Sequence, residues 1–317
     1  MARATSDTAP AIVFLLLYLA VFAVLARLYA TKAVKWRSRY SFVLFHVIMR
    51  VTGMALGVAF SCLSWEQERQ ARTGVLIAYL VFAAEGYFSL ILCASRFLIV
   101  WQQDRLGRSE LEPRIPKGTP TSERIKKLVA APILWIEYQL AAANAIIVAG
   151  SSIMSQSITN PDSPDAHSKS TTGKAMRIAG TGIFLGLVQA IIFIAILSYR
   201  KRGDRTLVMI LLTWPFLTAR GIYGILSVVT PGWSYSNAAA YGPNGFTSNF
   251  LAAEYAMGIA TEWVTCVLLL GTHFSALNGG DELVEDHNAE DTDKLRMQSL
   301  GDVETSRRSS VGARKEG

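Results

Sequence analysis

The sequence predicts an all-α membrane protein, a bundle of seven transmembrane helices. Among 317 residues, 51% are apolar and only 17% are charged, whereas soluble domains carry about 25% charged residues. The apolar residues gather in long runs that can span a hydrocarbon core about 30 Å thick. Such runs must be helical, because lipid offers no hydrogen-bond partners to backbone groups. The seven predicted spans are 10–29, 41–62, 74–100, 128–154, 178–199, 206–229 and 250–273.

Basic residues indicate how these spans are oriented. The segments after the first, third and fifth spans and the C-terminal segment hold 21 of the 31 Lys and Arg residues, while the N-terminus and the other loops hold six. Cytoplasmic loops are rich in Lys and Arg, so we predict an N-terminus outside the membrane and a cytoplasmic C-terminus. The net charge of +7 is then a sign of topology, and a nucleic-acid partner is not expected.

Two parts of the chain differ in composition. We expect a transmembrane domain over 1–277 and a cytoplasmic tail over 278–317, which holds ten acids and six bases and few large apolar residues, as disordered segments do. The three cysteines show no metal-ligand spacing, and phosphate-binding or dinucleotide-binding motifs are absent, so neither a metal nor a cofactor is expected. The predicted location is the plasma membrane or an endomembrane.

The first three spans differ in the residues that interrupt their apolar runs. The first is longer than the apolar core of a signal peptide, which favours a membrane helix. In the second, His46 and Arg50 lie four residues apart on one helix face. Gly53 and Gly57 form a pair of small residues that permits close helix packing. The third carries Glu85 near its middle.

The next three spans also carry recognisable devices. Glu137 and Asn144 on the fourth span lie seven residues apart and share a face. The fifth span has a second pair of small residues, Gly182 and Gly186. In the sixth, Pro215 removes a backbone hydrogen bond and is expected to bend or interrupt the helix. The loop that follows, 230–249, has no charge and is rich in aromatic residues, so it is either a lid or an ordered connector.

The seventh span presents one polar face. Its members recur with helical spacing and point to the bundle interior: Glu254, Gly258, Thr261, Glu262 and Thr265.

Ionisable residues in the middle of spans point to an internal polar pocket. Each costs about 2.5–3.5 kcal/mol at a helix centre, so each needs a partner or a function. Three acids and two bases lie at this depth, which predicts two ion pairs and one surplus acid that is neutral or balances a cationic ligand. Ion pairs that serve packing alone are the alternative. The candidate ligand-binding residues are Arg50, Glu85, Glu137, Asn144, Arg220, Tyr223, Glu254 and Glu262.

Several of these residues resemble a known family. The run 215–223 (PFLTARGIY), followed by Leu226 and Ser227, resembles a pattern in an uncharacterised family of fungal seven-helix membrane proteins, known only as a domain of unknown function. Residues 49–53 are similar to its arginine-x-x-glycine element, and Glu262 matches an acid on its last helix. Arg220, Tyr223 and the acids of the seventh span are distantly similar to fungal lipid-translocating exporters. The resemblance implies the seven-helix architecture and assigns no activity.

Three functions fit this pattern. The first, which we favour, is binding or translocation of a lipophilic or amphipathic small molecule, with membrane lipids and a second copy of the chain as further possible partners. Another is a seven-helix receptor, although the last span has neither a retinal-binding lysine nor the asparagine-proline-x-x-tyrosine element of rhodopsin-like receptors.

The remaining alternative is an intramembrane enzyme, such as a membrane-bound terpene cyclase of a secondary-metabolite pathway. A buried carboxylic acid would protonate an epoxide or alkene, and aromatic rings would stabilise the cation that forms. The candidate catalytic acids are Glu85, Glu137 and Glu262, and the candidate rings are Trp135, Tyr138 and Trp263.

Overall fold

The computed structural model describes residues 8–36, 38–62, 69–113, 131–159, 164–235, 237–242 and 245–278, together with isolated positions between 120 and 129. The chain divides into two units, residues 1–272 and residues 273–317, and the second is described only over residues 273–278. The helix bundle and the sites discussed for it belong to the first unit.

Long helices dominate the described residues. They are α1 (Thr8–Ala30), α2 (Tyr40–Cys62), α3 (Arg69–Arg105), α5 (Pro132–Thr159), α6 (Ala166–Lys201), α7 (Arg205–Leu212), α8 (Trp214–Val229), α9 (Ser248–Ala253), the π-helix η3 (Glu254–Ile259) and α10 (Ala260–Asn278). Between α8 and α9 lie two short 3-10 helices, η1 (Pro231–Trp233) and η2 (Ala238–Ala240), and the strands β1 (Tyr241–Gly242) and β2 (Gly245–Phe246). The two strands pair antiparallel, with Tyr241 opposite Phe246.

Six helical stretches among the described residues are long and apolar enough to cross a membrane. They are Thr8–Ala30, Tyr40–Cys62, Pro132–Met154, Ala166–Lys201, Arg205–Val229 and Ser248–Ser275. This all-α structure is consistent with a multi-pass membrane protein. The predicted third span, 74–100, lies within α3, which is not one of the six, so seven spans and their direction stay predictions.

The fifth and sixth predicted spans differ from the observed helices in ways that affect the site. α6 begins at Ala166 rather than at 178, because the polar residues that precede 178 form a helix packed against α5 and not a loop. The expected interruption of the sixth span is confirmed: α7 ends at Leu212, and α8 begins at Trp214 with Pro215 in its first turn. The Thr213 hydroxyl donates to the carbonyl of Ile210 at 2.7 Å and so caps the break.

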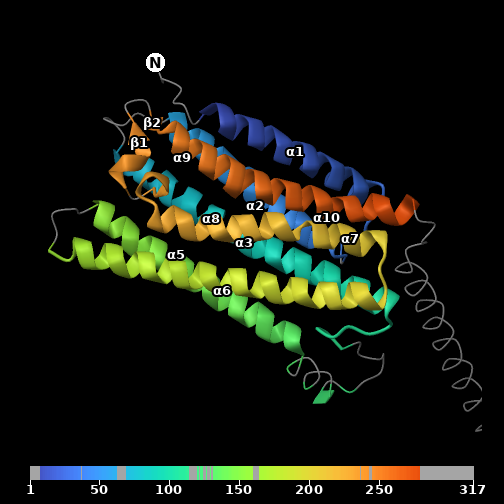
Figure 1. The fold of residues 1–317 in the computed structure, drawn as a ribbon. Coiled ribbons are helices and arrows are strands. Elements are labelled where there is room, and N and C mark those ends of the chain that lie inside the picture. Colours follow the sequence, from blue (N-terminus) through green and yellow to red (C-terminus); the bar gives the residue numbers. More distant parts are fainter. Residues whose placement is uncertain are drawn as a thin grey trace, which may run out of the picture. The chain divides into compact units, whose positions relative to one another are not determined.

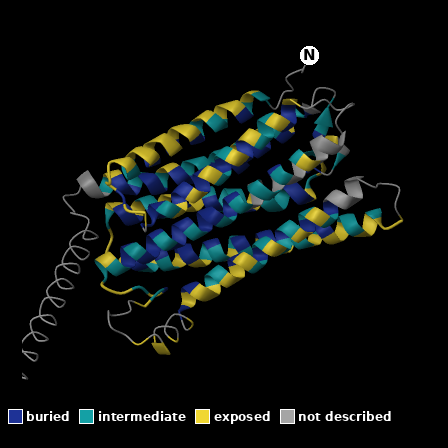
Figure 2. Ribbon diagram, turned by 180° about the vertical axis from the view of Figure 1, so that it is seen from behind, coloured by how far each residue is buried: buried dark blue, intermediate teal, exposed yellow. Residues whose placement is uncertain are grey.

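The helices are arranged around α3 (Figure 1). α3 contacts α2, α5, α6 and α7, while α5 and α6 form an antiparallel pair along one side of the first unit. Leu90, Phe97 and Leu98 of α3 are completely buried within the main apolar core. Figure 2 shows the buried residues concentrated between the helices and the exposed ones on their outward faces.

The outward faces are themselves apolar. Large apolar side chains of α1 are exposed, among them Val13, which is 53% exposed, and Leu16, which is 61% exposed. An apolar surface of this extent is unusual on a soluble monomer, and it suits contact with lipid acyl chains. The amino-acid sequence thus places its apolar residues on both sides of these helices, as a membrane bundle requires.

The segment between α8 and α9 packs as an aromatic cap, made of Phe60, Tyr235, Tyr241, Phe246 and Phe250. Its ring centroids lie 4.7 Å apart for Tyr235 and Phe250, and 4.5 Å apart for Phe246 and Phe250. Tyr235, Phe246 and Phe250 are buried. The uncharged loop expected here therefore has a packed core of its own and covers one end of α2.

Candidate functional site

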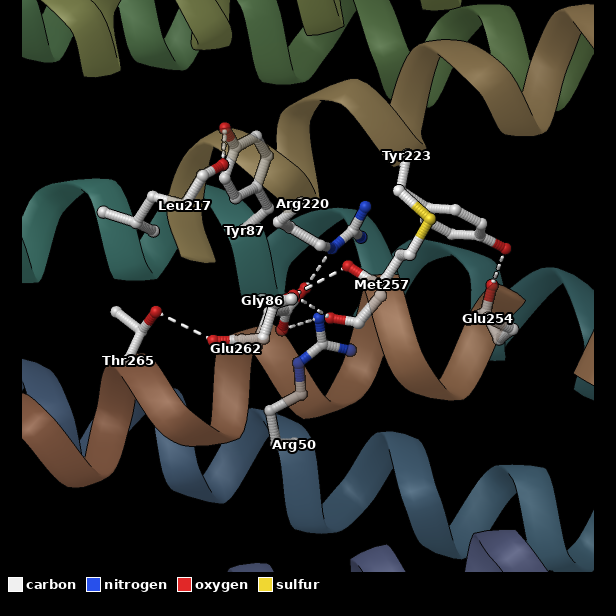
Figure 3. Close-up of polar contacts among 12 residues, drawn as sticks. Arg50, Gly86, Tyr87, Leu217, Arg220, Tyr223, Glu254, Met257, Glu262 and Thr265 are labelled. Carbon is white, nitrogen blue, oxygen red and sulfur yellow. Dashed lines mark hydrogen bonds and ion pairs between the residues drawn. The ribbon is translucent and has the colours of Figure 1, made fainter. Parts of the chain in front are cut away.

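An ion-pair cluster lies at the centre of the bundle, formed by Arg50 of α2, Arg220 of α8 and Glu262 of α10 (Figure 3). One carboxylate oxygen of Glu262 pairs with Nη2 of Arg50, and the other accepts a hydrogen bond from Nε of Arg220. The side chains of Glu262, Arg50 and Arg220 are 0%, 2% and 13% exposed. Three of the residues expected to meet in the interior are thus brought together, with one acid shared by two bases.

Gly86 of α3 makes room for this cluster. A Cβ atom at this position would overlap the guanidinium group of Arg50. Sequence reasoning missed Gly86, because a single glycine in an apolar run has no signature of its own. Three residues further along α3, the hydroxyl of Ser89 lies 2.9 Å from Nδ1 of His46, and the two groups share a hydrogen bond. Both residues are buried.

We expect Gly86→Ala to lower the free energy of unfolding by about 1–3 kcal/mol, because the new methyl group displaces a buried, ion-paired guanidinium. The matched control is Gly74→Ala on the same helix, where an added Cβ meets nothing within 4 Å. That control is expected to leave stability unchanged or to raise it slightly, since alanine favours the helix. Thermal unfolding in detergent micelles measures both, and equal melting temperatures for the two variants would contradict the prediction.

The other two candidate catalytic acids lie apart from the cluster. Glu85 accepts a hydrogen bond from the Asn144 side chain. Glu137 pairs with Arg96, which also binds Glu112 at 2.8 Å, and these side chains are 25–31% exposed. The expectation that all the mid-span charges meet in one pocket is therefore wrong for Glu85 and Glu137. Equal depth in the membrane does not bring residues together when they project from different faces of their helices.

Two of the candidate rings, Trp135 and Tyr138, do not surround an interior acid. Trp135 is 65% exposed and Tyr138 is 71% exposed, so both rings face outward from the bundle. Glu262, the remaining candidate acid, lies between two guanidinium groups. Proton donation from Glu262 would require a protonated carboxyl group in place of two ion pairs, so this geometry fits a packing role better than acid catalysis.

Glu254 forms a second buried polar group, on the π-helix η3. One of its carboxylate oxygens accepts a hydrogen bond from the hydroxyl of Tyr79 at 3.1 Å, and the other accepts one from the hydroxyl of Tyr223. Tyr235 donates in turn to the Tyr79 hydroxyl at 3.4 Å. Burial raises the pKa of Tyr235 above its ordinary value, so its hydroxyl keeps its proton. Segments of π-helix often occur at functional sites.

A cavity of about 60 Å³ lies beside these groups, and we name it the polar cavity for the charged and hydroxyl side chains in a wall that also includes Ile147 and Phe184. Helices α3, α5, α6, α8 and η3 all contribute to its wall, and the polar side chains that line it include Ser151, Arg177, Thr181, Arg220, Tyr223 and Glu254. Sequence reasoning missed Arg177, because it assigned the polar residues before 178 to a loop. Residues 166–177 (AHSKSTTGKAMR) form no apolar run, so this part of the helix lacks the signal that identified the spans.

A second cavity, of about 30 Å³, adjoins the first. Its wall is mainly apolar and aromatic, with Met54, Phe60 and Phe250 among its members. Both cavities are lined by Glu254 and Tyr235, so the two cavities meet at these two side chains.

The charges around the polar cavity differ from the expected surplus of acid. The cavity and the ion-pair cluster together hold three guanidinium groups, those of Arg50, Arg177 and Arg220, and two carboxylates, those of Glu254 and Glu262. The formal balance of these five groups is positive. The surplus changes sign because Glu85 and Glu137 lie elsewhere and because Arg177 belongs to a helix.

No protein-family model, curated protein or solved structure matches the chain. The arrangement of residues is therefore the basis for the function proposed for this protein.

Proposed function

We propose that this chain is a multi-pass membrane protein that binds an amphipathic small molecule within its helix bundle, as a carrier or translocator of that molecule. The observation that carries the proposal is the pair of adjoining cavities, one with two arginines in its wall and one with a mainly apolar and aromatic wall, that share Glu254 and Tyr235. An amphipathic molecule needs the two environments side by side, and ligand sites commonly combine an apolar wall with a few convergent polar groups.

The size of the polar cavity fits a head group. A water molecule occupies about 10–15 Å³ on the same measure, so a cavity of about 60 Å³ accepts a few waters or a group of several heavy atoms. The remainder of an amphipathic ligand would need apolar surroundings, which the second cavity and the lipid both offer.

Backbone irregularities in the cavity wall support movement of a ligand. The wall includes α8, which follows the break at Thr213, and η3, whose π-helical turns hold Glu254. Helix bends are commonly found at such prolines and π segments. Both elements therefore offer positions at which the wall can adjust without unfolding a regular helix.

We expect Ser151→Leu to weaken ligand binding about tenfold, because the larger side chain fills part of the polar cavity from α5. Ser152→Leu is the matched control, since Ser152 is exposed and its hydroxyl bonds the Val148 carbonyl of its own helix at 2.9 Å. The measurement is mass spectrometry of lipophilic molecules extracted from the purified wild type and both variants. A molecule recovered with the wild type and Ser152→Leu is expected to be depleted about tenfold in Ser151→Leu, which corresponds to about 1.4 kcal/mol.

Melting temperatures of the three proteins show whether both variants fold. Equal recovery of every molecule from all three folded proteins, or recovery of none from any, would contradict the proposed function.

A further inference from the structure

Hydrogen bonding in the polar cavity is unbalanced between donors and acceptors. Both carboxylate oxygens of Glu254 already accept a tyrosine hydroxyl, from Tyr79 and from Tyr223. The hydroxyl of Tyr87 donates to the carbonyl of Leu217 at 2.9 Å. The strongest acceptor in the cavity wall, the Glu254 carboxylate, thus already has a hydroxyl donor on each oxygen.

The two arginines in the cavity wall, by contrast, have N–H donors that are not used within the described part of the chain. The side chain of Arg177 lines the cavity, and it makes no ion pair or hydrogen bond with any residue that the structure describes. Arg220 uses Nε for Glu262, and the end of its guanidinium group points away from that carboxylate (Figure 3). A guanidinium carries five N–H donors and no acceptor. The cavity wall therefore offers a ligand positively charged N–H donors.

A cationic or a purely aromatic guest fits this wall poorly. The rings of Tyr87 and Tyr223 already face the guanidinium of Arg220, with Cζ 5.3 Å and 5.8 Å from their centroids. These rings are then not available to stabilise a second cation. The surplus guanidinium charge would also repel it.

We infer that the polar cavity binds the anionic head group of an amphipathic molecule, a carboxylate or a phosphate, between Arg177 and Arg220. This inference rests on the proposed function and assigns the chemical class of its ligand. Arginine recognises both groups with charge-assisted hydrogen bonds, often two at a time. An anion there supplies acceptors for the open donors of the cavity wall and balances the positive formal charge of the five groups.

The test compares probes that share one chain and differ in their head group. Oleate and oleyl phosphate are anionic, oleyl alcohol is uncharged and oleylamine is cationic, and inorganic phosphate represents a free anion without a chain. Binding to the purified protein in nanodiscs of zwitterionic lipid is measured by competition against radiolabelled oleyl phosphate. We expect the wild type to bind both anionic probes at least about tenfold more tightly than the alcohol or the amine, a difference of about 1.4 kcal/mol or more.

The variant that tests the assignment is Arg177→Gln, with Lys174→Gln as the matched control one turn earlier on α6. Lys174 does not line the cavity. Arg177→Gln is expected to weaken binding of the anionic probes about tenfold, while binding by Lys174→Gln stays at the wild-type level. Its melting temperature is expected to match the wild type, because Arg177 has no ion pair among the described residues to lose. Displacement of the label by inorganic phosphate alone would assign the site to a free anion, and no displacement assigns it to the amphipathic one.

Failure of the inference differs from failure of the proposed function. Tighter binding of oleyl alcohol or oleylamine, weakened by Ser151→Leu, would overturn the anionic head group and leave the amphipathic ligand in place. If Ser151→Leu changed the binding of none of the probes, both the inference and the proposed function would be overturned. Equal binding of anionic probes by Arg177→Gln and Lys174→Gln would remove Arg177 from the site.

Discussion

Glu262→Leu is expected to lower the free energy of unfolding by about 3–5 kcal/mol, because it removes the one carboxylate shared by two guanidinium groups. Arg50 would remain buried at 2% exposure without this partner. A guanidinium that loses its carboxylate in a low-dielectric interior raises the free energy of the folded state, because water cannot reach it to replace the lost interaction. Reversible unfolding in mixed micelles, followed by circular dichroism, measures the change.

The matched control is Glu137→Leu, another acid of a helix interior. Glu137 is 31% exposed, and its partner Arg96 keeps Glu112 at 2.8 Å. An exposed pair contributes about 1 kcal/mol or less, so this control is expected to have a small effect. The double variant Arg50→Leu with Glu262→Leu is expected to recover part of the lost stability, since it also removes the buried guanidinium that loses its carboxylate partner. Similar losses for Glu262→Leu and Glu137→Leu would show that the ion-pair cluster is not what stabilises the bundle.

The contrast between these two acids shows what the sequence can predict of the site. Depth in the membrane follows from counting residues along an apolar run, and it correctly selected Arg50, Arg220 and Glu262 as residues that need partners. Pairing depends on how each helix is rotated about its axis, which the packing of neighbouring side chains decides. Gly86, at which a Cβ atom would overlap Arg50, is part of that packing and has no pattern in the sequence.

The cavity was harder to predict than the ion pairs. Arg177 lies in a polar run that resembles a loop, yet a helix that packs against another protein helix does not need to be apolar throughout. Tyr235 lies far along the chain from Tyr79, and only the fold of the aromatic cap brings their hydroxyls to 3.4 Å. Arg177 and Tyr235 line the cavity because segments distant in the sequence contact each other. A single sequence has no periodic pattern that predicts such contacts.

Glycine packing shows the same limit and leads to a second large effect. The pair Gly182 and Gly186 has the spacing typical of close helix contact, but an added Cβ meets nothing within 4 Å at either position. The close approach of α5 and α6 occurs instead at Gly150 and Gly173. A Cβ on Gly173 would lie 2.6 Å from the carbonyl oxygen of Gly150, and a Cβ on Gly150 would lie 2.8 Å from the carbonyl oxygen of Gly173.

We expect Gly173→Leu to lower the free energy of unfolding by about 3 kcal/mol or more, because backbone atoms block the new side chain and the two helices must separate. Gly182→Leu on the same helix is the matched control and is expected to be close to neutral, since its side chain enters open space. Unfolding in mixed micelles compares them, and equal losses would mean that α5 and α6 are not held at this contact.

Separation of α5 from α6 also has a consequence for the polar cavity. Ser151 follows Gly150 on α5, and Arg177 lies one turn after Gly173 on α6, so the helix contact and the cavity wall share the same turns. Gly173→Leu is therefore expected to weaken binding of oleyl phosphate as well, whereas Gly182→Leu retains it. Because glycine at these two positions sets the distance between the helices, it also sets the width of the space between Ser151 and Arg177.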